Sequence, residues 1–185
     1  METVLLCGKG GGDTLTETLV KTLEQYGKVL YAGEQKLQHT DPGFPDFFVR
    51  EQENLPELCM ESGILVFKTG VRLKRSIRIP EGMRCVLNSR NHQTAELLGR
   101  MKIPAAACGM GSRDTLGIAS LDFEGAVLSL QRNIFTLQGN LLEPHDFRVK
   151  VQGNAGPAQI LTISMILLLL GLDSGEGFCI VSGAA

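Results

Sequence analysis

A glycine-rich stretch near the start of the chain has the composition of a loop that binds phosphate: residues 7–14 read Cys-Gly-Lys-Gly-Gly-Gly-Asp-Thr. Glycines let the backbone approach an anion, and successive N–H groups ahead of a helix then point at it. The lysine and hydroxyl that usually close such a loop supply a positive charge and a magnesium ligand. Gly12 and Asp13 stand in their places here. The candidate cofactor-binding residues are Gly8, Lys9, Gly10, Gly11, Gly12, Asp13 and Thr14.

Two features of this stretch compete with a bound phosphate. Thr14 and Glu17 have the spacing of a capping box, in which the two side chains satisfy the first free N–H groups of a helix. Asp13 adds a negative charge at the positive helix end, which stabilises the protein by about 0.3–1 kcal/mol and opposes an incoming anion. A glycine-rich turn without a ligand therefore stays open as an alternative.

A dinucleotide site is disfavoured by the same residues. Gly8-Lys9-Gly10 begins the fingerprint GxGxxG, and Glu34 follows the second expected strand, where an acid would meet a ribose. The third glycine position, however, is Asp13, and a small residue is needed there for close helix packing. The sequence therefore argues against NAD.

The elements around the loop place it at a turn from a strand to a helix. Thr3 to Cys7 is an expected strand, and Leu15, Leu19 and Leu23 recur on one helix face. Residues 1–116 continue in this alternating way, with strands expected at 28–32, 64–67, 85–87 and 105–108 and a helix over 91–101. This half predicts an α/β fold with a mostly parallel sheet of the Rossmann or P-loop type and flanking helices, whose ligands bind at the carboxyl ends of the strands.

The second half, residues 117–185, has a different pattern of expected secondary structure. Short strands expected at 117–121, 126–130, 133–137 and 147–151 predict an antiparallel meander. Pro157 then opens a helix to about Leu170 that is apolar nearly all round, so we expect it to be buried. Residues 36–58 lack a clear period, and Phe47-Phe48 is expected to anchor a loop or a short helix. We expect a single domain over residues 1–185.

Charge and cysteine content narrow the function classes. The formal net charge of −2 gives no reason to expect a nucleic-acid partner. Six basic residues surround one turn, and we interpret them as a solvated face, with an anionic ligand or acidic partner as the alternative: Lys68, Arg72, Lys74, Arg75, Arg78 and Arg84. The five widely spaced cysteines indicate buried thiols in a reducing compartment. With no signal peptide and no apolar run long enough to span a bilayer, the sequence predicts a cytoplasmic protein.

A second glycine-bearing loop follows a strand at residues 109–115. Ser112 and Arg113 offer a hydroxyl and a guanidinium, which makes them a candidate contact for a phosphate or carboxylate. A surface position for Arg113, or a turn contact with Asp114, is the favoured interpretation. Cys7 and Cys108 end equivalent strands, and we expect both to serve packing and not nucleophilic chemistry.

The loop, the mixed sheet, the meander and the last helix together resemble the central, ATP-binding domain of the Mur ligase family. That family's loop, Gly-Thr-Asn-Gly-Lys-Thr-Thr, lies on residues 8–14, where Gly8 and Gly11 match and Gly12 replaces the lysine. Its Asn-x-Asp-Asp element lies on residues 88–91, where Asn88 is kept and the acids are lost. Its final Gly-x-His-Asn-x-x-Asn-Ala element keeps Gly153 and has Gln159 for the second asparagine.

The resemblance implies a nucleotide site with incomplete machinery. It adds Asn88 to the candidate cofactor-binding residues and implies ATP or ADP with Mg²⁺ as cofactors. The magnesium-binding glutamate of the family falls in a region that holds Glu51, Glu53, Glu57 and Glu61, and the sequence does not select among them. The family's flanking domains are not expected in 185 residues.

Three functions follow from these observations. The first is a degenerate Mur-ligase-like domain without complete ligase activity, which binds a nucleotide or phosphate weakly and is linked to cell-envelope or polymer synthesis. The second is a non-enzymatic interaction module that uses the basic residues, and the third is a small ATP-dependent ligase completed by a partner chain. All three are compatible with a protein partner or a homo-oligomer.

Overall fold

The computed structural model describes residues 1–9, 14–68, 70–71, 73, 77–122 and 124–182. Residues 10–13 of the glycine-rich loop, and Arg72, Lys74 and Arg75 of the basic turn, lie outside the described residues. The helices and strands are β1 (Glu2–Cys7), α1 (Thr14–Leu23), β2 (Val29–Ala32), β3 (Leu37–His39), β4 (Phe47–Gln52), β5 (Ser62–Phe67), β6 (Gly82–Asn88), α2 (His92–Arg100), β7 (Ala105–Cys108), β8 (Leu116–Leu121), β9 (Gly125–Leu130), β10 (Ile134–Phe135), β11 (Leu141–Leu142), β12 (His145–Gln152), α3 (Pro157–Leu169) and β13 (Phe178–Val181).

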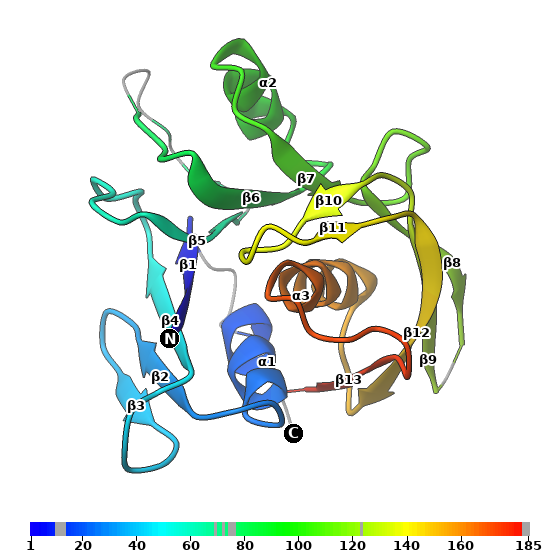
Figure 1. The fold of residues 1–185 in the computed structure, drawn as a ribbon, viewed down its shortest axis with the longest axis horizontal. Coiled ribbons are helices and arrows are strands. Elements are labelled where there is room, and N and C mark those ends of the chain that lie inside the picture. The colour runs from blue at the N-terminus through cyan, green and yellow to red at the C-terminus, as the bar shows by residue number, and fades with distance from the viewer. Residues whose placement is uncertain (10–13, 69, 72, 74–76, 123, 183–185) are drawn as a thin grey trace.

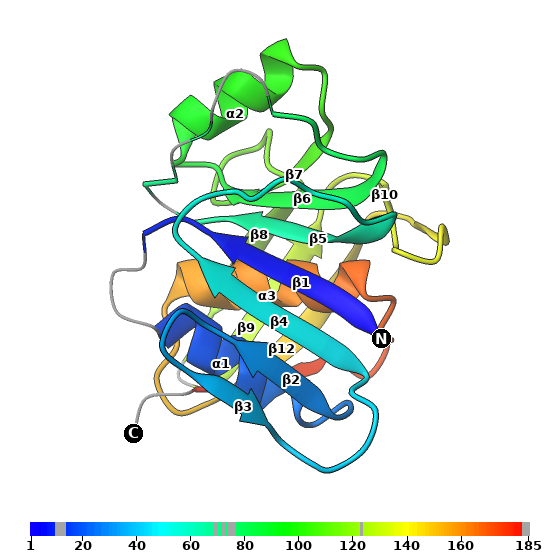
Figure 2. The ribbon, with the colours of Figure 1, turned by 90° about the vertical axis from the view of Figure 1, so that its left-hand side faces the viewer.

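An eleven-stranded sheet organises the described residues, in the order β13-β12-β9-β8-β7-β6-β5-β1-β4-β2-β3. The run from β8 through β7, β6, β5, β1 and β4 to β2 is parallel throughout. Figure 2 shows β6, β5, β1, β4, β2 and β3 side by side in this order. The expected α/β class with a mostly parallel sheet is confirmed.

The sheet curls around two helices. Figure 1 shows α1 and α3 inside the curve and α2 on its outer face. The apolar residues of α3 are buried from Ile160 to Leu170, and the helix packs on β6, β7 and β8, as its all-round apolar sequence predicts. Outside the curve, Leu98 of α2 packs with buried residues of the middle strands such as Phe67 and Cys85. Both faces of the middle strands are thus covered, as is usual for parallel strands.

Helix α1 closes the β13 edge of the sheet. The Val181 N–H donates to Thr22 Oγ1 at 3.1 Å, and Gln25 Nε2 donates to the Cys179 carbonyl at 3.0 Å. Side chains of α1 and of the turn that follows it therefore satisfy backbone groups that an edge strand would otherwise expose.

Two sequence-based predictions about strands were wrong. Phe47-Phe48 begins β4, a strand inside the sheet between β1 and β2, and not a loop or short helix. Residues 133–137 do not join the meander, because β10 pairs with β11 in a separate two-stranded sheet. The meander consists of β8, β9 and β12, and the unpredicted strand β13 runs parallel to β12. The main sheet continues across residue 116, since β8 pairs with β7 as well as with β9.

Candidate functional site

The carboxyl ends of β1, β4 and β5 meet beside the start of α1. In the parallel register Cys7 lies opposite Gln52 of β4 and Phe67 of β5, so Gly8, Glu51 and Lys68 come to one edge of the sheet. The Gly8 N–H donates to the Gln52 carbonyl at 3.1 Å, and the Lys68 N–H donates to the Cys7 carbonyl at 2.8 Å. The backbone of all three strands is therefore fixed at the point where the glycine-rich loop leaves β1.

Gly8 has a conformation and a position that only glycine tolerates well. Its φ of +128° lies in the left-handed region, where side chains are strained. A Cβ at this position would lie 3.0 Å from Lys68 Cβ and 3.2 Å from Val71 Cβ. The backbone of the loop thus packs directly on the lysine that follows β5.

Lys68 and Glu51 form a buried ion pair at this edge. Lys68 Nζ makes a salt bridge with Glu51 Oε1, and the two side chains are only 7% and 13% exposed. The Tyr31 hydroxyl donates to the other carboxylate oxygen, Glu51 Oε2, at 3.1 Å. Asn91 Nδ2 donates to the Lys68 carbonyl at 3.3 Å, which helps to hold the lysine backbone. A carboxylate, an ammonium and a phenol therefore converge behind Gly8.

An open cavity of about 620 Å³ lies in front of this pair, a size within the range of small-molecule sites. Gly8, Tyr31 and Glu51 form part of its wall. Its mouth carries several charged side chains: Glu17, Glu34, Lys36 and Glu53. We call this space the β1-end cavity. The exposed carboxylates at its mouth give it a negative rim.

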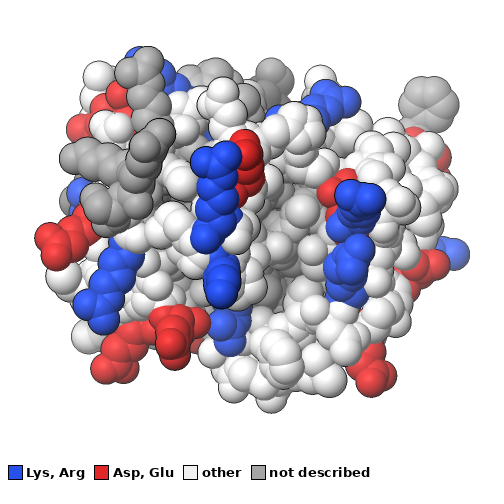
Figure 3. All heavy atoms as spheres, turned by 90° about the horizontal axis from the view of Figure 1, so that it is seen from above, with Lys and Arg blue, Asp and Glu red and all other residues white. Residues whose placement is uncertain are grey.

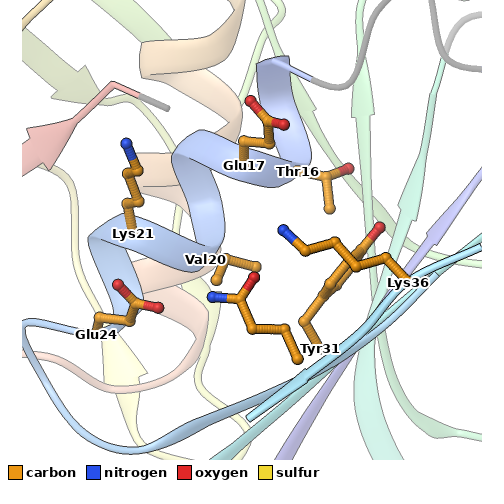
Figure 4. A pocket seen from close by; sticks show the side chains of 8 residues that line it. Thr16, Glu17, Val20, Lys21, Glu24, Tyr31 and Lys36 are labelled. Atoms are coloured by element: carbon orange, nitrogen blue, oxygen red, sulfur yellow. The ribbon is translucent and has the colours of Figure 1, made fainter. Parts of the chain in front are cut away.

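A smaller pocket of about 250 Å³ adjoins the β1-end cavity and shares Glu17, Tyr31 and Lys36 with it. Figure 4 shows Lys36 extending toward α1, so that the pocket lies between the helix and the β2–β3 hairpin. The buried Thr16 Oγ1, in its wall, has no hydrogen-bond partner in the described structure. The two spaces together form one polar groove along α1.

The candidate residues of the glycine-rich loop lie in part outside the described residues, namely Gly10, Gly11, Gly12 and Asp13. Lys9 is exposed, and Gly8 is buried. Thr14 is the first residue of α1, and its Oγ1 accepts a hydrogen bond from Gln159 Nε2 at 2.8 Å. Gln159 Oε1 also accepts from the Gly156 N–H at 2.8 Å, so this side chain ties the starts of α1 and α3 together. The capping box of Thr14 and Glu17 stays a prediction.

Asn88, Ser112 and Arg113 do not line the β1-end cavity. Asn88 ends β6, two strands from β1, and its Oδ1 accepts a hydrogen bond from the Arg90 N–H at 2.9 Å. Ser112 and Arg113 are exposed in the loop after β7, three strands from β1. Their roles as nucleotide or anion contacts stay predictions that the site geometry does not support.

Lys68 and Arg84, two of the described basic residues around the turn at 68–84, both have protein partners. The prediction of a solvated position was wrong for Lys68, which is buried in its pair with Glu51. Arg84 donates from Nε to the Phe135 carbonyl at 3.1 Å and from Nη2 to the Thr136 carbonyl at 3.3 Å. Figure 3 shows the described Lys and Arg side chains of one face spread among acidic and uncharged ones.

The two cysteines at strand ends are buried, as expected, whereas the expectation of a buried thiol was wrong for Cys59, which is exposed. Cys7 and Cys108 are fully buried. Burial raises the pKa of Cys7, an effect that the hydrogen bond from Gln52 and the charges of Arg50 and Lys68 partly offset. Burial, followed by the nearby charge of Asp114, raises the pKa of Cys108. Both thiols therefore stay protonated at neutral pH and lack nucleophilic character.

Sequence reasoning missed Lys68 as a site residue and left Glu51 unselected. Lys68 was grouped with its basic sequence neighbours, although it directly follows a buried strand, which is a signal for the carboxyl edge of a parallel sheet. Glu51 was one of four glutamates because β4 was not recognised. The pairing of β4 with β1 brings Glu51 to the cavity wall, which Glu53 also lines.

The described residues fit a magnesium ion poorly. Gly8 brings a glycine backbone to the wall of the cavity, which is the kind of group that a phosphate contacts, and on its other side it packs on Lys68 and Val71. Mg²⁺ requires octahedral oxygen coordination, usually with one or two carboxylates. Both oxygens of Glu51 already have protein partners. No group of three potential metal-binding side chains occurs among the described residues. The described donor set therefore does not fit Mg²⁺.

Comparison with known proteins places the fold among the Mur ligases. A UDP-N-acetylmuramoyl-L-alanyl-D-glutamate–2,6-diaminopimelate ligase matches 95% of this chain with a TM-score of 0.57 and 10% identity. The MurF ligase from Thermotoga maritima, solved with ADP, matches 95% with a TM-score of 0.54 and 11% identity. A UDP-N-acetylmuramate:L-alanyl-γ-D-glutamyl-meso-diaminopimelate ligase from Neisseria meningitides matches 94% with a TM-score of 0.59 and 14% identity.

This likeness shows a shared fold and no more, because the identities are low. The chain spans 45%, 47% and 63% of the lengths of those three proteins. Neither a protein-family model nor a curated protein sequence matches the chain. No helix of the described residues has the length and apolar character needed to cross a membrane.

Proposed function

We propose that the chain is a Mur-ligase-fold domain that binds the phosphates of a nucleotide at the β1-end cavity and lacks the complete ligase machinery. The observation that carries the proposal is the packing of left-handed Gly8 against Lys68, at the turn from β1 toward α1. This is where such folds hold phosphate, and the loop has lost its usual lysine at position 12. The Lys68 ammonium neutralises the Glu51 carboxylate, which would otherwise oppose a phosphate at this edge.

The altered motifs support binding without the ligase reaction. Gly12 and Asp13 replace the lysine and threonine of the family's loop, and Arg90 and Asn91 replace its acids. Asn91 caps α2 through its Oδ1 and also contacts the Lys68 carbonyl, which is a structural role. By analogy with the ligases that share the fold, the domain serves cell-envelope or polymer synthesis.

Thermal unfolding tests the binding directly. Millimolar ATP, ADP and phosphate, each with and without Mg²⁺, should raise the melting temperature, because a ligand at 100 times its Kd adds about 2.7 kcal/mol to stability. Gly8→Val should abolish the shift by displacing the loop backbone, because a side chain is strained at this φ and meets Lys68. Lys150→Ala, at an exposed position on β12, is the matched control and should keep it. The absence of any shift in the unmodified protein would refute the proposal.

Turnover separates this proposal from a ligase completed by a partner chain. The domain should release no ADP from ATP when candidate amine acceptors are added. Steady ADP release that depends on an acceptor and is lost in Lys9→Ala would favour the ligase.

A further inference from the structure

The Glu51–Lys68 ion pair bears on whether a ligand in the β1-end cavity needs a divalent metal ion beside it. A carboxylate beside a phosphate site normally calls for a divalent cation, because the ion then bridges two groups of negative charge. Glu51 is the least exposed carboxylate that lines this cavity, with 13% of its side chain exposed. Its negative charge is already met by the Lys68 ammonium.

Lys68 is held at Glu51 through its backbone as well as its ammonium. Its N–H donates to the Cys7 carbonyl, and its carbonyl accepts from Asn91 Nδ2. Gly8 packs on its Cβ, and Tyr31 fixes the far oxygen of Glu51. These contacts fix the start of the Lys68 side chain close to Glu51, so a metal ion at the carboxylate would have to displace the ammonium from its ion pair. Removing it would leave a buried, uncompensated carboxylate.

We infer that Lys68 is a built-in counter-ion that takes the place of a divalent metal, so that the cavity binds phosphate-bearing ligands without Mg²⁺. This inference rests on the proposed phosphate site for its ligand, whereas its statement about metal concerns the chain alone. The ion pair makes the floor of the cavity electrically neutral at Glu51. An anionic ligand therefore meets no unpaired buried carboxylate there, and it needs no ion to screen one.

The first measurement is Mn²⁺ binding to the ligand-free protein, followed by electron paramagnetic resonance. Mn²⁺ is the probe because it takes the same oxygen ligands as Mg²⁺. The unmodified protein should show no Mn²⁺ site that depends on Glu51, so its titration should match that of Glu51→Gln. Lys68→Ala vacates the cation position and should gain a Mn²⁺ site. The double variant Glu51→Gln/Lys68→Ala should lack that site.

The second measurement compares ligand-induced melting shifts in Mg²⁺ and in EDTA. ATP and inorganic phosphate should shift the unmodified protein and Lys68→Arg equally in both solutions. Lys68→Ala should need the divalent ion. A shift seen only with Mg²⁺, or a Mn²⁺ site in the unmodified protein that Glu51→Gln removes, would overturn the inference.

The two proposals fail in different ways. If no ligand changes the melting temperature, with or without Mg²⁺, the phosphate site is refuted. The Mn²⁺ titration then tests by itself whether Lys68 acts as the counter-ion of Glu51. If Lys68→Ala does not fold, the comparison of the unmodified protein with Glu51→Gln still decides it. In that comparison, identical Mn²⁺ titrations support the inference and different ones overturn it.

Discussion

The loops that follow β1 and β7 start from nearly the same local sequence and end with different properties. Each strand closes on a fully buried cysteine followed by a glycine, Cys7-Gly8 and Cys108-Gly109. At the β1 end the neighbouring strands β4 and β5 bring Glu51 and Lys68 together beside an open cavity. At the β7 end, buried Asp114 accepts a hydrogen bond from the Gly111 N–H at 2.7 Å, and Ser112 and Arg113 point to solvent.

This difference shows that neighbouring strands decide what such a loop can do. The β7 loop satisfies the Gly111 N–H from within, through Asp114, and Arg132 Nε donates to the Arg113 carbonyl from the turn after β9. The β1 edge depends on residues 44 and 61 positions further along the chain, which only strand pairing brings to Cys7. Five experiments test this difference between the two loops.

The largest effect should come from Lys68→Met. This change leaves the Glu51 carboxylate buried without its partner, which should cost about 3–5 kcal/mol of unfolding free energy. Urea denaturation measures the loss, and Lys68→Met/Glu51→Met should recover most of it, because the double variant buries no unpaired charge. A loss of unfolding free energy below about 1 kcal/mol would mean that water solvates the ion pair. The β1 and β7 ends would then differ less than their geometry indicates.

Alanine at a loop glycine should also distinguish the two regions. Gly8→Ala forces a side chain into the left-handed region and against Lys68 Cβ at 3.0 Å, at a cost of about 1–3 kcal/mol. Gly111→Ala places its Cβ 3.2 Å from Asp114 Oδ2 at a negative φ, and the contact is with a side-chain tip. Its cost should be clearly smaller in the same denaturation assay. Equal costs would contradict the close packing at the β1 end.

Alkaline pH should weaken the protein through its buried thiols. Burial raises the pKa of Cys85 from 9.0 to about 12, and it also raises those of Cys7 and Cys108. Unfolded thiols ionise at lower pH than these folded ones. For Cys85 the contribution is therefore fully present below pH 9 and falls as pH rises toward 12, by about 1.4 kcal/mol per pH unit; Cys7 and Cys108 change stability in the same direction.

Denaturant midpoints between pH 8 and 11 measure this dependence. Cys59→Ser, at an exposed position, should leave the slope unchanged, and Cys85→Ala should reduce it. Asp114→Asn should lower the pKa of Cys108, because it removes the carboxylate that opposes the thiolate. Thiolate absorbance that develops at the same pH in native and unfolded protein would contradict the burial argument.

The exposed acids at the mouth of the β1-end cavity should modulate ligand affinity modestly. Glu34→Gln/Glu53→Gln removes two negative charges that oppose a phosphate, so ATP should bind more tightly, by less than about tenfold. The gain should shrink as salt is raised, since exposed charges are screened. Isothermal calorimetry at two ionic strengths measures both effects. A weaker interaction in this variant would indicate that the rim favours cationic ligands.

The smallest effect should come from Arg113→Ala in the β7 loop. The side chain is exposed, so the unfolding free energy should change by no more than about 0.5 kcal/mol. The melting shift with phosphate should also stay as it is in the unmodified protein. If this variant loses the phosphate-induced rise in melting temperature, the anion site would lie at the β7 end and not at the β1 end.

Most of the fold was predictable where apolar residues are periodic. Thr3 to Cys7, residues 105–108 and the apolar helix after Pro157 all form as expected, because each is a long enough apolar run with a clear beginning. Strand β4 was not predictable in this way, since Phe47-Phe48-Val49 is followed at once by Arg50 and Glu51. Its strand conformation comes from hydrogen bonding between β1 and β2.

The site was predictable only as a loop. The sequence placed Gly8 at a turn from strand to helix and recognised that position 12 lacks its lysine. It assigned Lys68 to a basic surface because charged neighbours in sequence are usually neighbours on a surface. The pairing of β5 with β1 removes Lys68 from that surface and puts it beside Gly8.

The sequence by itself determined the alternating α/β character, the buried last helix and a glycine turn after the first strand, because these depend on local periodicity and on residues close in sequence. Only the tertiary structure decided that Glu51, Lys68 and Tyr31 meet behind Gly8. That meeting depends on the order and register of parallel strands, which hydrogen bonds between distant segments set.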